Sequence, residues 1–339
     1  MKKTLLSISL ATAGLLTLGT QAQASTLNDV QSAGELRCGV STGLPGFSQP
    51  DSDGHWRGID VDTCRAIAAA VLGDADAVEF VPLTAAERFT AVQSGEIDVL
   101  SRNTTWTTVR DASLGLNFTG TNYYDGQGFL VKTALGVSSA LELDGASVCI
   151  QAGTTTELNL ADYFRANGMA YEAIVFDTSE QSATGFDNDR CDILTSDTSQ
   201  LAALRTQLSD PSSAMVLPEI ISKEPLGPVV RQGDDAWFNV VKWVLFLQIN
   251  AEEYGVSMAN VDEMLESSDP NVQRLVGTAG DMGDLLGLPA DFGYQVISQV
   301  GSYADMFERN VGPDTPLGLS RGINALWTDG GILYAPPVR

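Results

Sequence analysis

The sequence predicts an α/β protein divided into two domains, and three observations support this prediction. The chain has 339 residues, which is more than a single hydrophobic core usually holds. Short apolar runs typical of strands alternate with helical patterns through residues 35–208. A buried strand followed by a polar turn and a helix start occurs twice, at 97–108 and at 147–157. This repeated junction places one such unit in each half of the chain.

The first 24 residues are predicted to be a secretory signal peptide. Lys2 and Lys3 form its basic start, residues 5–18 its apolar run, and Ala22–Ala24 a small-residue cleavage site. The apolar run is too short to span a membrane as a helix, and no later segment is long and apolar enough to do so. We therefore expect a mature chain that begins at Ser25 outside the cytoplasm.

The charge balance excludes some classes of function. The chain has 43 acidic and 19 basic residues and a net charge of −24. Such an excess of acid argues against nucleic acid or an anionic membrane surface as a partner. The acids are dispersed, so they do not by themselves imply a cationic ligand. His55 is the only histidine, which excludes histidine-based triads and multi-histidine metal sites. We expect neither a metal nor a cofactor.

Four cysteines are expected to form disulfides. They are too far apart for the C-x-x-C spacing of a zinc or redox site, and an even number in an oxidising compartment favours bridges. They are Cys38, Cys64, Cys149 and Cys191. Three connectivities are possible, and the spacing alone does not choose between them.

The first third of the chain shows the alternation that α/β folds require. It predicts a helix at 28–34, a strand at 35–40, a glycine- and proline-rich turn at 41–48, a helix from Asp60 through Val71 and a strand at 77–83. Asp60 and Asp62 stand at a helix start, where carboxylates are stabilising. We interpret them as capping and solvated residues rather than as catalytic acids.

The stretch from Arg88 to Asp111 is the most informative of the sequence. A short helix stopped by Gly95 leads into a buried strand at 97–100, and small polar residues follow: Ser101, Asn103, Thr104, Thr105, Thr107 and Thr108. Thr107 or Thr108 can cap a helix whose first N–H groups attract anions. Arg110, one turn in, offers a bidentate fork for a carboxylate. A polar loop with a solvated arginine remains the alternative.

The second half repeats this arrangement. The strand at 147–150 leads to a glycine–hydroxyl turn in which Thr154 and Glu157 are spaced for a capping box. The turn is too short for a Walker A loop and has no lysine, so phosphate binding has weak support. Asp197 ends the strand that follows Asp189, where it is suited to cap a helix at 198–208.

Two extended segments and a helical C-terminal part complete the pattern. Residues 118–131 are aromatic-rich and residues 216–231 proline-rich, and both are predicted to be extended. A helix that contains Trp237 and Trp243 follows, and the helical spacing of its aromatic residues indicates core packing. From Asp262 onward the chain is polar and helical.

Several of these segments resemble one family. Residues 95–111, G-E-I-D-V-L-S-R-N-T-T-W-T-T-V-R-D, resemble the corresponding segment of periplasmic amino-acid-binding proteins, the solute receptors of ABC importers. Gly58–Asp62 resembles the signature before that family's first long helix, and Gln151–Glu157 resembles its second-lobe anion-binding turn. Residues 308–318 resemble the subfamily of general L-amino-acid receptors.

The resemblance implies a fold and a domain division. The fold is the two-lobed periplasmic binding protein fold of type II, in which each lobe is a sheet flanked by helices and two hinge crossings join the lobes. Lobe 1 would contain residues 25–122 and 226–339, the latter including a C-terminal extension that we expect to pack on it. Lobe 2 would contain residues 123–225. With this division, Cys38–Cys64 and Cys149–Cys191 are the expected disulfides, one within each lobe.

The resemblance also implies a ligand site. The family binds a ligand's α-carboxylate with a small-residue turn and an arginine, which match Asn103, Thr105 and Arg110. The second-lobe turn matches Thr154 and Thr155, the carboxylate that receives the α-ammonium matches Asp197, and the aromatic residue that stacks on the ligand matches Phe47.

The side-chain pocket is expected to select weakly among ligands. Only Phe47, Trp106 and Tyr123 or Tyr124 are candidates to line it, with no acid or base that would select one charge. Apolar contacts discriminate by only about 1–3 kcal/mol. We therefore expect several polar L-amino acids to bind, such as glutamate, glutamine, aspartate and histidine, with D-isomers rejected.

The resemblance further implies a monomeric receptor that acts with membrane permease subunits and is not an enzyme. The competing class is a cyclohexadienyl dehydratase acting on prephenate or arogenate, because some of these enzymes use the same fold with a general acid in the cleft. The sequence contains no nucleophile–base arrangement that would favour that class.

Overall fold

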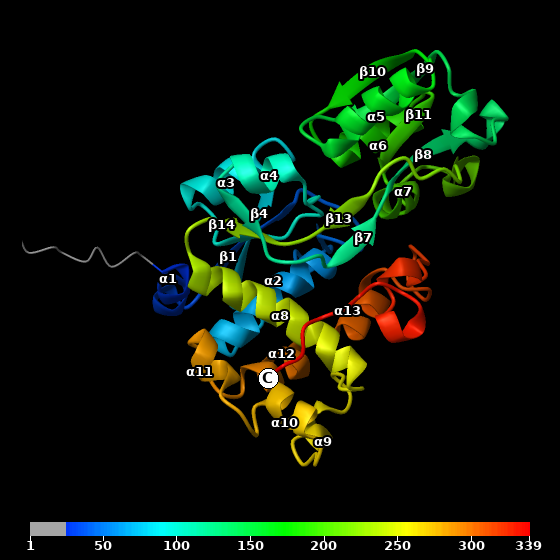
Figure 1. Ribbon diagram of the computed structural model, residues 1–339. Helices are drawn as coiled ribbons and strands as arrows, with labels where there is room; N and C mark the ends of the chain where they lie inside the picture. Colours follow the sequence, from blue (N-terminus) through cyan, green and yellow to red (C-terminus); the bar gives the residue numbers. More distant parts are fainter. Residues whose placement is uncertain (1–24) are drawn as a thin grey trace, which may run out of the picture.

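The computed structural model describes residues 25–339, and the predicted signal peptide lies outside the described residues. Figure 1 shows two bodies, each built on a five-stranded sheet, with a two-stranded ribbon between them. We call the body that contains the first strands lobe 1 and the other lobe 2. The predicted two-lobed α/β fold is confirmed.

Lobe 1 is built on a sheet with the order β4-β1-β5-β14-β6. β4, β1 and β5 are parallel, whereas β14 is antiparallel to β5 and to β6. The strands are β1 (Leu36–Ser41), β4 (Val78–Leu83), β5 (Val99–Leu100), β6 (Leu116–Phe118) and β14 (Val229–Arg231). The other elements before β7 are α1 (Thr26–Ala33), a hairpin of β2 (Gln49–Pro50) and β3 (Trp56–Arg57), α2 (Ile59–Leu72), α3 (Arg88–Ser94) and α4 (Thr108–Ser113).

Lobe 2 has the same arrangement, with the strand order β10-β9-β11-β8-β12. Three parallel strands are again followed by antiparallel pairings. The strands are β8 (Gln127–Lys132), β9 (Ala146–Gln151), β10 (Tyr171–Phe176), β11 (Ile193–Asp197) and β12 (Ala214–Val216). The helices are α5 (Thr155–Ala166), α6 (Ser179–Asp187) and α7 (Thr198–Arg205).

The chain passes between the lobes along an antiparallel ribbon. Its strands are β7 (Tyr123–Asp125) and β13 (Glu224–Leu226), which pair Glu224 with Asp125 and Leu226 with Tyr123. Both strands fall within the two segments that were predicted to be extended crossings. The ribbon therefore occupies the position of a hinge between the two sheets (Figure 1).

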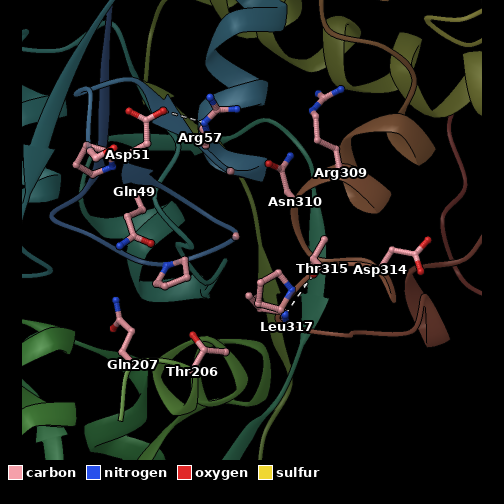
Figure 2. Close-up of a pocket in the computed structure, with 16 residues that line it drawn as sticks. Gln49, Asp51, Arg57, Thr206, Gln207, Arg309, Asn310, Asp314, Thr315 and Leu317 are labelled. Carbon is pink, nitrogen blue, oxygen red and sulfur yellow. Dashed lines mark hydrogen bonds and ion pairs between the residues drawn. The ribbon is translucent and has the colours of Figure 1, made fainter. Parts of the chain in front are cut away.

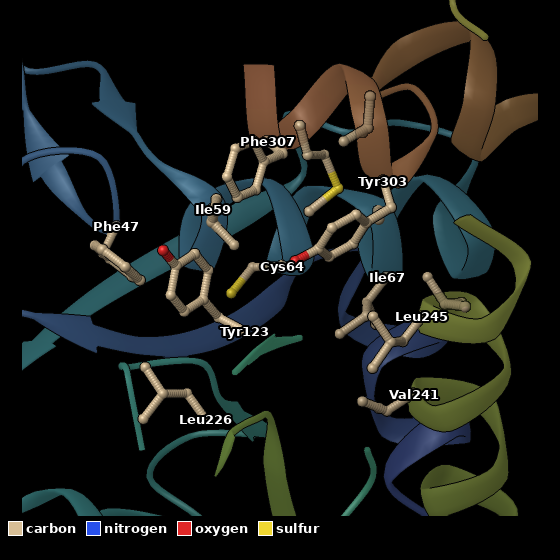
Figure 3. Close-up of a cluster of buried hydrophobic side chains, with 14 of the residues drawn as sticks. Phe47, Ile59, Cys64, Ile67, Tyr123, Leu226, Val241, Leu245, Tyr303 and Phe307 are labelled. Carbon is tan, nitrogen blue, oxygen red and sulfur yellow. The ribbon is translucent and has the colours of Figure 1, made fainter. Parts of the chain in front are cut away.

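The C-terminal part of the chain packs on lobe 1. α8 (Asp235–Glu253) buries Trp237, whose indole N–H donates to the Asp98 carbonyl at 2.8 Å, which confirms its predicted core position. The C-terminal extension (residues 257–339) adds α9 (Val261–Met264), α10 (Pro270–Val276), α11 (Met282–Leu286), α12 (Phe292–Gln299) and α13 (Tyr303–Asn310). Figure 3 shows side chains of α13, α8 and α2 meeting in one apolar cluster. Within residues 25–339, no helix combines the length and apolar character needed to cross a membrane.

The predicted disulfides are confirmed. Cys38–Cys64 joins β1 to α2, and Cys149–Cys191 joins β9 to the turn before β11. Each bridge lies within one lobe, so neither one restrains the movement of one lobe relative to the other.

Candidate ligand-binding cleft

A polar cavity lies between the lobes, where the turns after β5 and β9 face one another. Its solvent-accessible volume is about 10 Å³. Its lining residues come from both lobes: Arg88, Arg102, Asn103, Thr105, Gln151, Thr154, Thr155, Thr156, Ser196, Asp197 and Gln200. The cavity therefore brings together four of the seven predicted ligand residues from the two turns, and Asp197 as a fifth.

The lobe 1 wall is the turn Ser101–Thr105, which Asp60 and the hinge ribbon hold in place. Asp60 accepts hydrogen bonds from the Ser101 hydroxyl at 3.0 Å and from the Asn103 N–H at 2.8 Å. The Gly227 N–H, just beyond β13, donates to the Thr104 carbonyl at 3.0 Å. The predicted capping role of Asp60 is wrong, because Gly58 occupies the N-cap of α2 and no side chain caps that helix.

Two buried arginines face the cavity, and the sequence interpretation assigned a role to neither. Arg88 is 2% exposed, and its Nη2 donates to the Gly153 carbonyl of lobe 2 at 3.4 Å. Its Nε has no hydrogen-bond partner. Burial lowers the pKa of Arg88 well below its usual value, and the nearby guanidinium groups of Arg110 and Arg102 add to this effect. The available signal in the sequence was its position at the first residue of α3, the helix that precedes β5 and the ligand turn.

Arg102 is the second buried cation. Its Nε donates to the Leu83 carbonyl at 2.9 Å, and its Nη1 lies 3.5 Å from the Asn103 side-chain oxygen. Burial lowers its pKa to about 10, so it stays charged at neutral pH. Neither Arg88 nor Arg102 forms an ion pair among the described residues. The cavity thus contains positive charge that no protein carboxylate neutralises by direct contact.

Arg110 lies behind the Thr105 turn rather than in the cavity lining. Thr107 caps α4 by accepting from the Arg110 N–H at 3.3 Å, as predicted for Thr107. The Arg110 Nη1 donates to the Thr105 carbonyl at 2.9 Å. Its guanidinium carbon lies 5.2 Å from the centre of the Phe89 ring, and that of Arg88 lies 4.8 Å from the same ring. Arg110 therefore supports the backbone of the ligand turn, and its guanidinium lies against the same ring as that of Arg88.

The lobe 2 wall contributes hydroxyl groups and one carboxylate. Thr155 donates to Glu224 of the hinge ribbon at 3.0 Å. Thr154 stands at the N-cap of α5 but donates its hydroxyl to the Gln151 carbonyl at 2.8 Å, and no side chain caps the helix. The predicted capping box between Thr154 and Glu157 is therefore wrong.

Asp197 is free to face the cavity because another residue caps α7. Asp125 of the ribbon accepts from the Ser199 N–H at 3.2 Å and from the Thr198 hydroxyl at 2.6 Å. Asp197 stands at the N-cap position without making a capping bond. Burial, followed by the neighbouring carboxylates Asp125 and Glu224, raises its pKa well above the usual value for aspartate. Asp197 was predicted to cap α7, to receive the ligand's α-ammonium, or both. It does not cap α7, and its position in the cleft leaves the second role possible.

The lobes touch directly across the cavity. The Thr105 and Thr155 hydroxyls lie 3.3 Å apart, and the Asn103 side chain donates to Gln200 at 2.9 Å. On the same side, the Thr42 hydroxyl lies 3.4 Å from Glu180. These contacts belong to a closed arrangement of the two lobes, in which the cavity is shielded.

The aromatic residues expected around the ligand lie elsewhere. Phe47 is 1% exposed and packs edge-on against Tyr123 with 5.4 Å between ring centres (Figure 3). Trp106 is 40% exposed and stacks on Phe118 at 5.6 Å. Neither of them lines the cavity. Phe47 is therefore a core residue of lobe 1, and its predicted stacking on the ligand is not supported by this arrangement.

A wider groove lies at the outer edge of the lobe interface. Figure 2 shows it between the 45–52 loop, the end of α13 with the following tail, and Thr206 and Gln207 of lobe 2. Two of its charged residues, Arg57 and Asp51, form an ion pair with each other. The shielded cavity, with its unpaired cation and its buried carboxylate, is the better candidate for a specific site.

Similarity to known proteins agrees with this geometry. Residues 36–256 match the bacterial extracellular solute-binding proteins, family 3. The chain is 56% identical over the full length of both chains to the putative amino-acid ABC transporter-binding protein YhdW of Escherichia coli K12. It is 54% identical, again over both full lengths, to the general L-amino acid-binding periplasmic protein AapJ of Rhizobium johnstonii.

A solved structure adds to this similarity. A periplasmic binding protein from Brucella ovis, with glutathione bound, is 53% identical and superposes with a TM-score of 0.92. The match covers 93% of this chain and all of that one. These relatives are named as binding proteins rather than as enzymes. The chain belongs to the bacterial extracellular solute-binding proteins of family 3.

Proposed function

We propose that this chain is the solute receptor of an amino-acid ABC importer, and that it binds L-amino acids between its lobes with a preference for those that carry a second carboxylate. The preference rests on one observation, the buried Arg88 with its unpartnered Nε. A buried guanidinium without a counter-ion is costly, and a ligand carboxylate would supply both the charge and the missing acceptor.

The rest of the cavity suits the two groups that all α-amino acids share. The turn Asn103–Thr105, supported by Arg110, and the turn Thr154–Thr155 offer donors to the α-carboxylate. Asp197 offers its carboxylate to the α-ammonium, whose charge would oppose the burial and the neighbouring carboxylates that raise its pKa. Several polar amino acids can meet these shared requirements, as the sequence suggested. The two buried arginines add a selection for negative charge that the sequence interpretation had not placed.

The transport role follows from family membership and from the cavity's position between the lobes. A ligand that contacts both walls binds the closed state better than the open one, which lets closure report occupancy to a permease. We propose that the chain acts in the periplasm as a monomer and delivers its ligand to membrane permease subunits. The relatives give no support to the dehydratase alternative.

Calorimetry tests the proposal. The purified protein is unfolded, dialysed and refolded to remove any co-purified ligand, then titrated with each L-amino acid, with D-glutamate and with glutathione. Glutathione is included because it combines an α-amino acid end with a further carboxylate. We expect L-glutamate and L-aspartate to bind at least tenfold more tightly than L-glutamine and L-asparagine, with D-glutamate rejected.

Two outcomes would contradict the proposal. If no amino acid gave a binding signal, the protein would not be a receptor for this class of ligand. Equal affinity for each acid and its amide would retain the assignment but remove the charge preference. Incubation with prephenate and arogenate, followed by product analysis, checks the enzymatic alternative in the same sample.

A further inference from the structure

We propose that Asp60 is a positioning residue for the ligand, because its buried carboxylate sets the shape of the Ser101–Thr105 turn that forms the lobe 1 wall of the cleft. This inference rests on the proposed function of that cleft. Asp60 is 2% exposed and lies in the first turn of α2. Its side chain makes no capping bond to its own helix, and it reaches a turn more than forty residues away in the sequence.

Each carboxylate oxygen of Asp60 accepts one hydrogen bond from this turn. Oδ1 accepts from the Ser101 hydroxyl at 3.0 Å, and Oδ2 accepts from the Asn103 N–H at 2.8 Å. Burial raises the pKa of Asp60 to about 6, which leaves it ionised at neutral pH, so that both oxygens act as acceptors. The charge of Arg102 and a side-chain hydrogen bond from Asn122 also favour the ionised form.

Asn103 is the residue that most needs such a contact. Its φ is +33°, and only one other non-glycine residue among those described has a positive φ. Asparagine tolerates the left-handed region better than most residues, but the conformation persists only where the surroundings hold it. The bond from Asp60 to the Asn103 N–H acts at the strained residue itself.

The bend at Asn103 determines what the turn presents to the cleft. It places Arg102 and Thr105, on either side, among the residues that line the cavity. It also directs the Asn103 side chain to Gln200 of lobe 2, at 2.9 Å. Asp60 thus controls three residues of the cleft without touching the cavity.

A backbone hydrogen bond and a disulfide hold Asp60 in place relative to β5, the strand that precedes the turn. Its own N–H donates to the Phe47 carbonyl at 3.0 Å. One helical turn later, Cys64 is linked to Cys38 of β1, and Cys38 pairs with Val99 of β5. The turn follows β5 directly. The disulfide therefore ties the helix that carries Asp60 to the sheet that carries the turn.

Asp62 provides a matched control on the same helix. It is 5% exposed, and its Oδ2 accepts from Arg309 and from Asn310 of the C-terminal extension, both at 2.6 Å. It makes no contact with the ligand turn among the described residues. A substitution at Asp62 removes a buried carboxylate and its bonds as a substitution at Asp60 does, but on the side of the helix that faces the extension.

The test compares Asp60→Ala, Asp60→Asn and Asp62→Ala by calorimetric affinity for L-glutamate and by thermal melting. We expect Asp60→Ala to weaken affinity at least 30-fold. Asp62→Ala should lower the melting temperature but keep affinity within threefold. Asp60→Asn should stay within about fivefold, because its amide can accept from the Asn103 N–H and donate to the Ser101 hydroxyl.

Hydrogen exchange of the turn amides supplies a readout that needs no ligand. The Asn103 N–H should exchange faster in Asp60→Ala than in the parent or in Asp62→Ala. If Asp60→Ala does not fold, Ser101→Ala removes one of the two hydrogen bonds between Asp60 and the turn while leaving α2 unchanged, and it should weaken affinity about fivefold. Unchanged affinity in a folded Asp60→Ala or in Ser101→Ala, or an equal loss in Asp62→Ala, would overturn the inference. Absence of L-glutamate binding by the parent protein would instead contradict the proposed function.

Discussion

The two lobes share a strand arrangement and contribute opposite charges to the cleft. The order β4-β1-β5-β14-β6 in lobe 1 corresponds, strand for strand, to β10-β9-β11-β8-β12 in lobe 2. Each sheet sends a hydroxyl-rich turn into the cavity and is anchored by one disulfide. Lobe 1, however, supplies the guanidinium groups of Arg88 and Arg102, whereas lobe 2 supplies the carboxylate of Asp197.

This difference in charge between the two walls of the cleft favours one orientation of a bound ligand. A zwitterion that spans the cavity meets cations on one side and an anion on the other, so one orientation is favoured over the reverse. Electrostatic complementarity of this kind contributes more to selection than to total affinity. Two similar scaffolds can therefore form a directional site by exchanging a few residues in equivalent turns.

The lobes also differ in how they are supported. The C-terminal extension packs on lobe 1 and on the hinge: the Asn324 side chain accepts from the Tyr124 N–H at 2.7 Å and donates to its carbonyl at 2.9 Å. The Tyr303 hydroxyl donates to the Asn122 carbonyl at 2.8 Å. No hydrogen bond or ion pair within residues 25–339 joins the extension to lobe 2. Lobe 1 with β7 is thus a braced body against which lobe 2 can move.

Substitution of Arg88 should produce the largest change and test the charge difference. Arg88→Gln removes the buried cation of lobe 1 while keeping a polar side chain. We expect L-glutamate affinity to fall by about 2–5 kcal/mol, the usual cost of removing one partner of a buried charge pair. L-Glutamine affinity should change much less, and calorimetry measures both.

Arg57→Gln is the control for Arg88→Gln, since Arg57 is an exposed lobe 1 arginine that pairs with Asp51 outside the cavity. It should leave both affinities unchanged. Equal weakening of glutamate and glutamine by Arg88→Gln would show that Arg88 does not recognise a second carboxylate.

Substitution of Asn324 tests the difference in support. Asn324→Ala leaves the N–H and the carbonyl of Tyr124 without their partners in a partly buried position. We expect a loss of about 1–3 kcal/mol in the free energy of unfolding, the usual cost of unsatisfied polar groups. Denaturant titration provides the measurement. Asn167→Ala, which removes an exposed bond within α5 to Tyr163, should cost less than half as much. If both substitutions lowered the free energy of unfolding equally, the contact between the extension and the hinge would not stabilise lobe 1 specifically.

A smaller effect concerns pH and Asp197. Its raised pKa means that the carboxylate holds a proton above the ordinary aspartate range, and a bound ammonium would favour the ionised form. Binding should therefore release protons. Affinity should be fully present above the raised pKa and should fall as pH drops below it, by at most tenfold per pH unit. Titrations in buffers of different ionisation enthalpy count the protons, and proton uptake on binding would contradict this assignment.

The sequence predicted the parts of the structure that depend on local chemistry. Thr107, one of the two expected caps, caps α4, and it is only three residues from the Arg110 N–H that donates to it. The two extended crossings are also found as predicted. The cysteine pairing is found as well, but it was predicted from the lobe division that the family resemblance implied and not from local chemistry. Strand–turn–helix junctions leave a clear local pattern, so both turns of the cleft were identified.

The errors concern side chains whose partners lie far away in the sequence. Asp60 and Asp197 both stand at helix starts, and the predicted cap is wrong for both: Asp60 binds the Ser101–Thr105 turn, and Asp197 lines the cavity, which is the other position predicted for it. Asp197 is free because Asp125, from the ribbon, caps its helix. The position of Phe47 depends on Tyr123 and on α13, which no local pattern reveals. Which polar or aromatic group faces a cleft is decided by tertiary packing.

One measurement tests the central claim that lobe 2 holds the ammonium of a ligand whose carboxylates face lobe 1. L-Glutamate and glutarate, which lacks the amino group, are titrated into the parent protein and into Asp197→Asn. The parent should prefer L-glutamate by about 2–5 kcal/mol, the usual cost of removing one partner of a buried charge pair. Asp197→Asn should lose most of that preference, which gives a large coupling between residue and amino group. If the two proteins discriminate equally between the two ligands, the ammonium is held elsewhere, and the opposite polarity of the lobes does not orient the ligand.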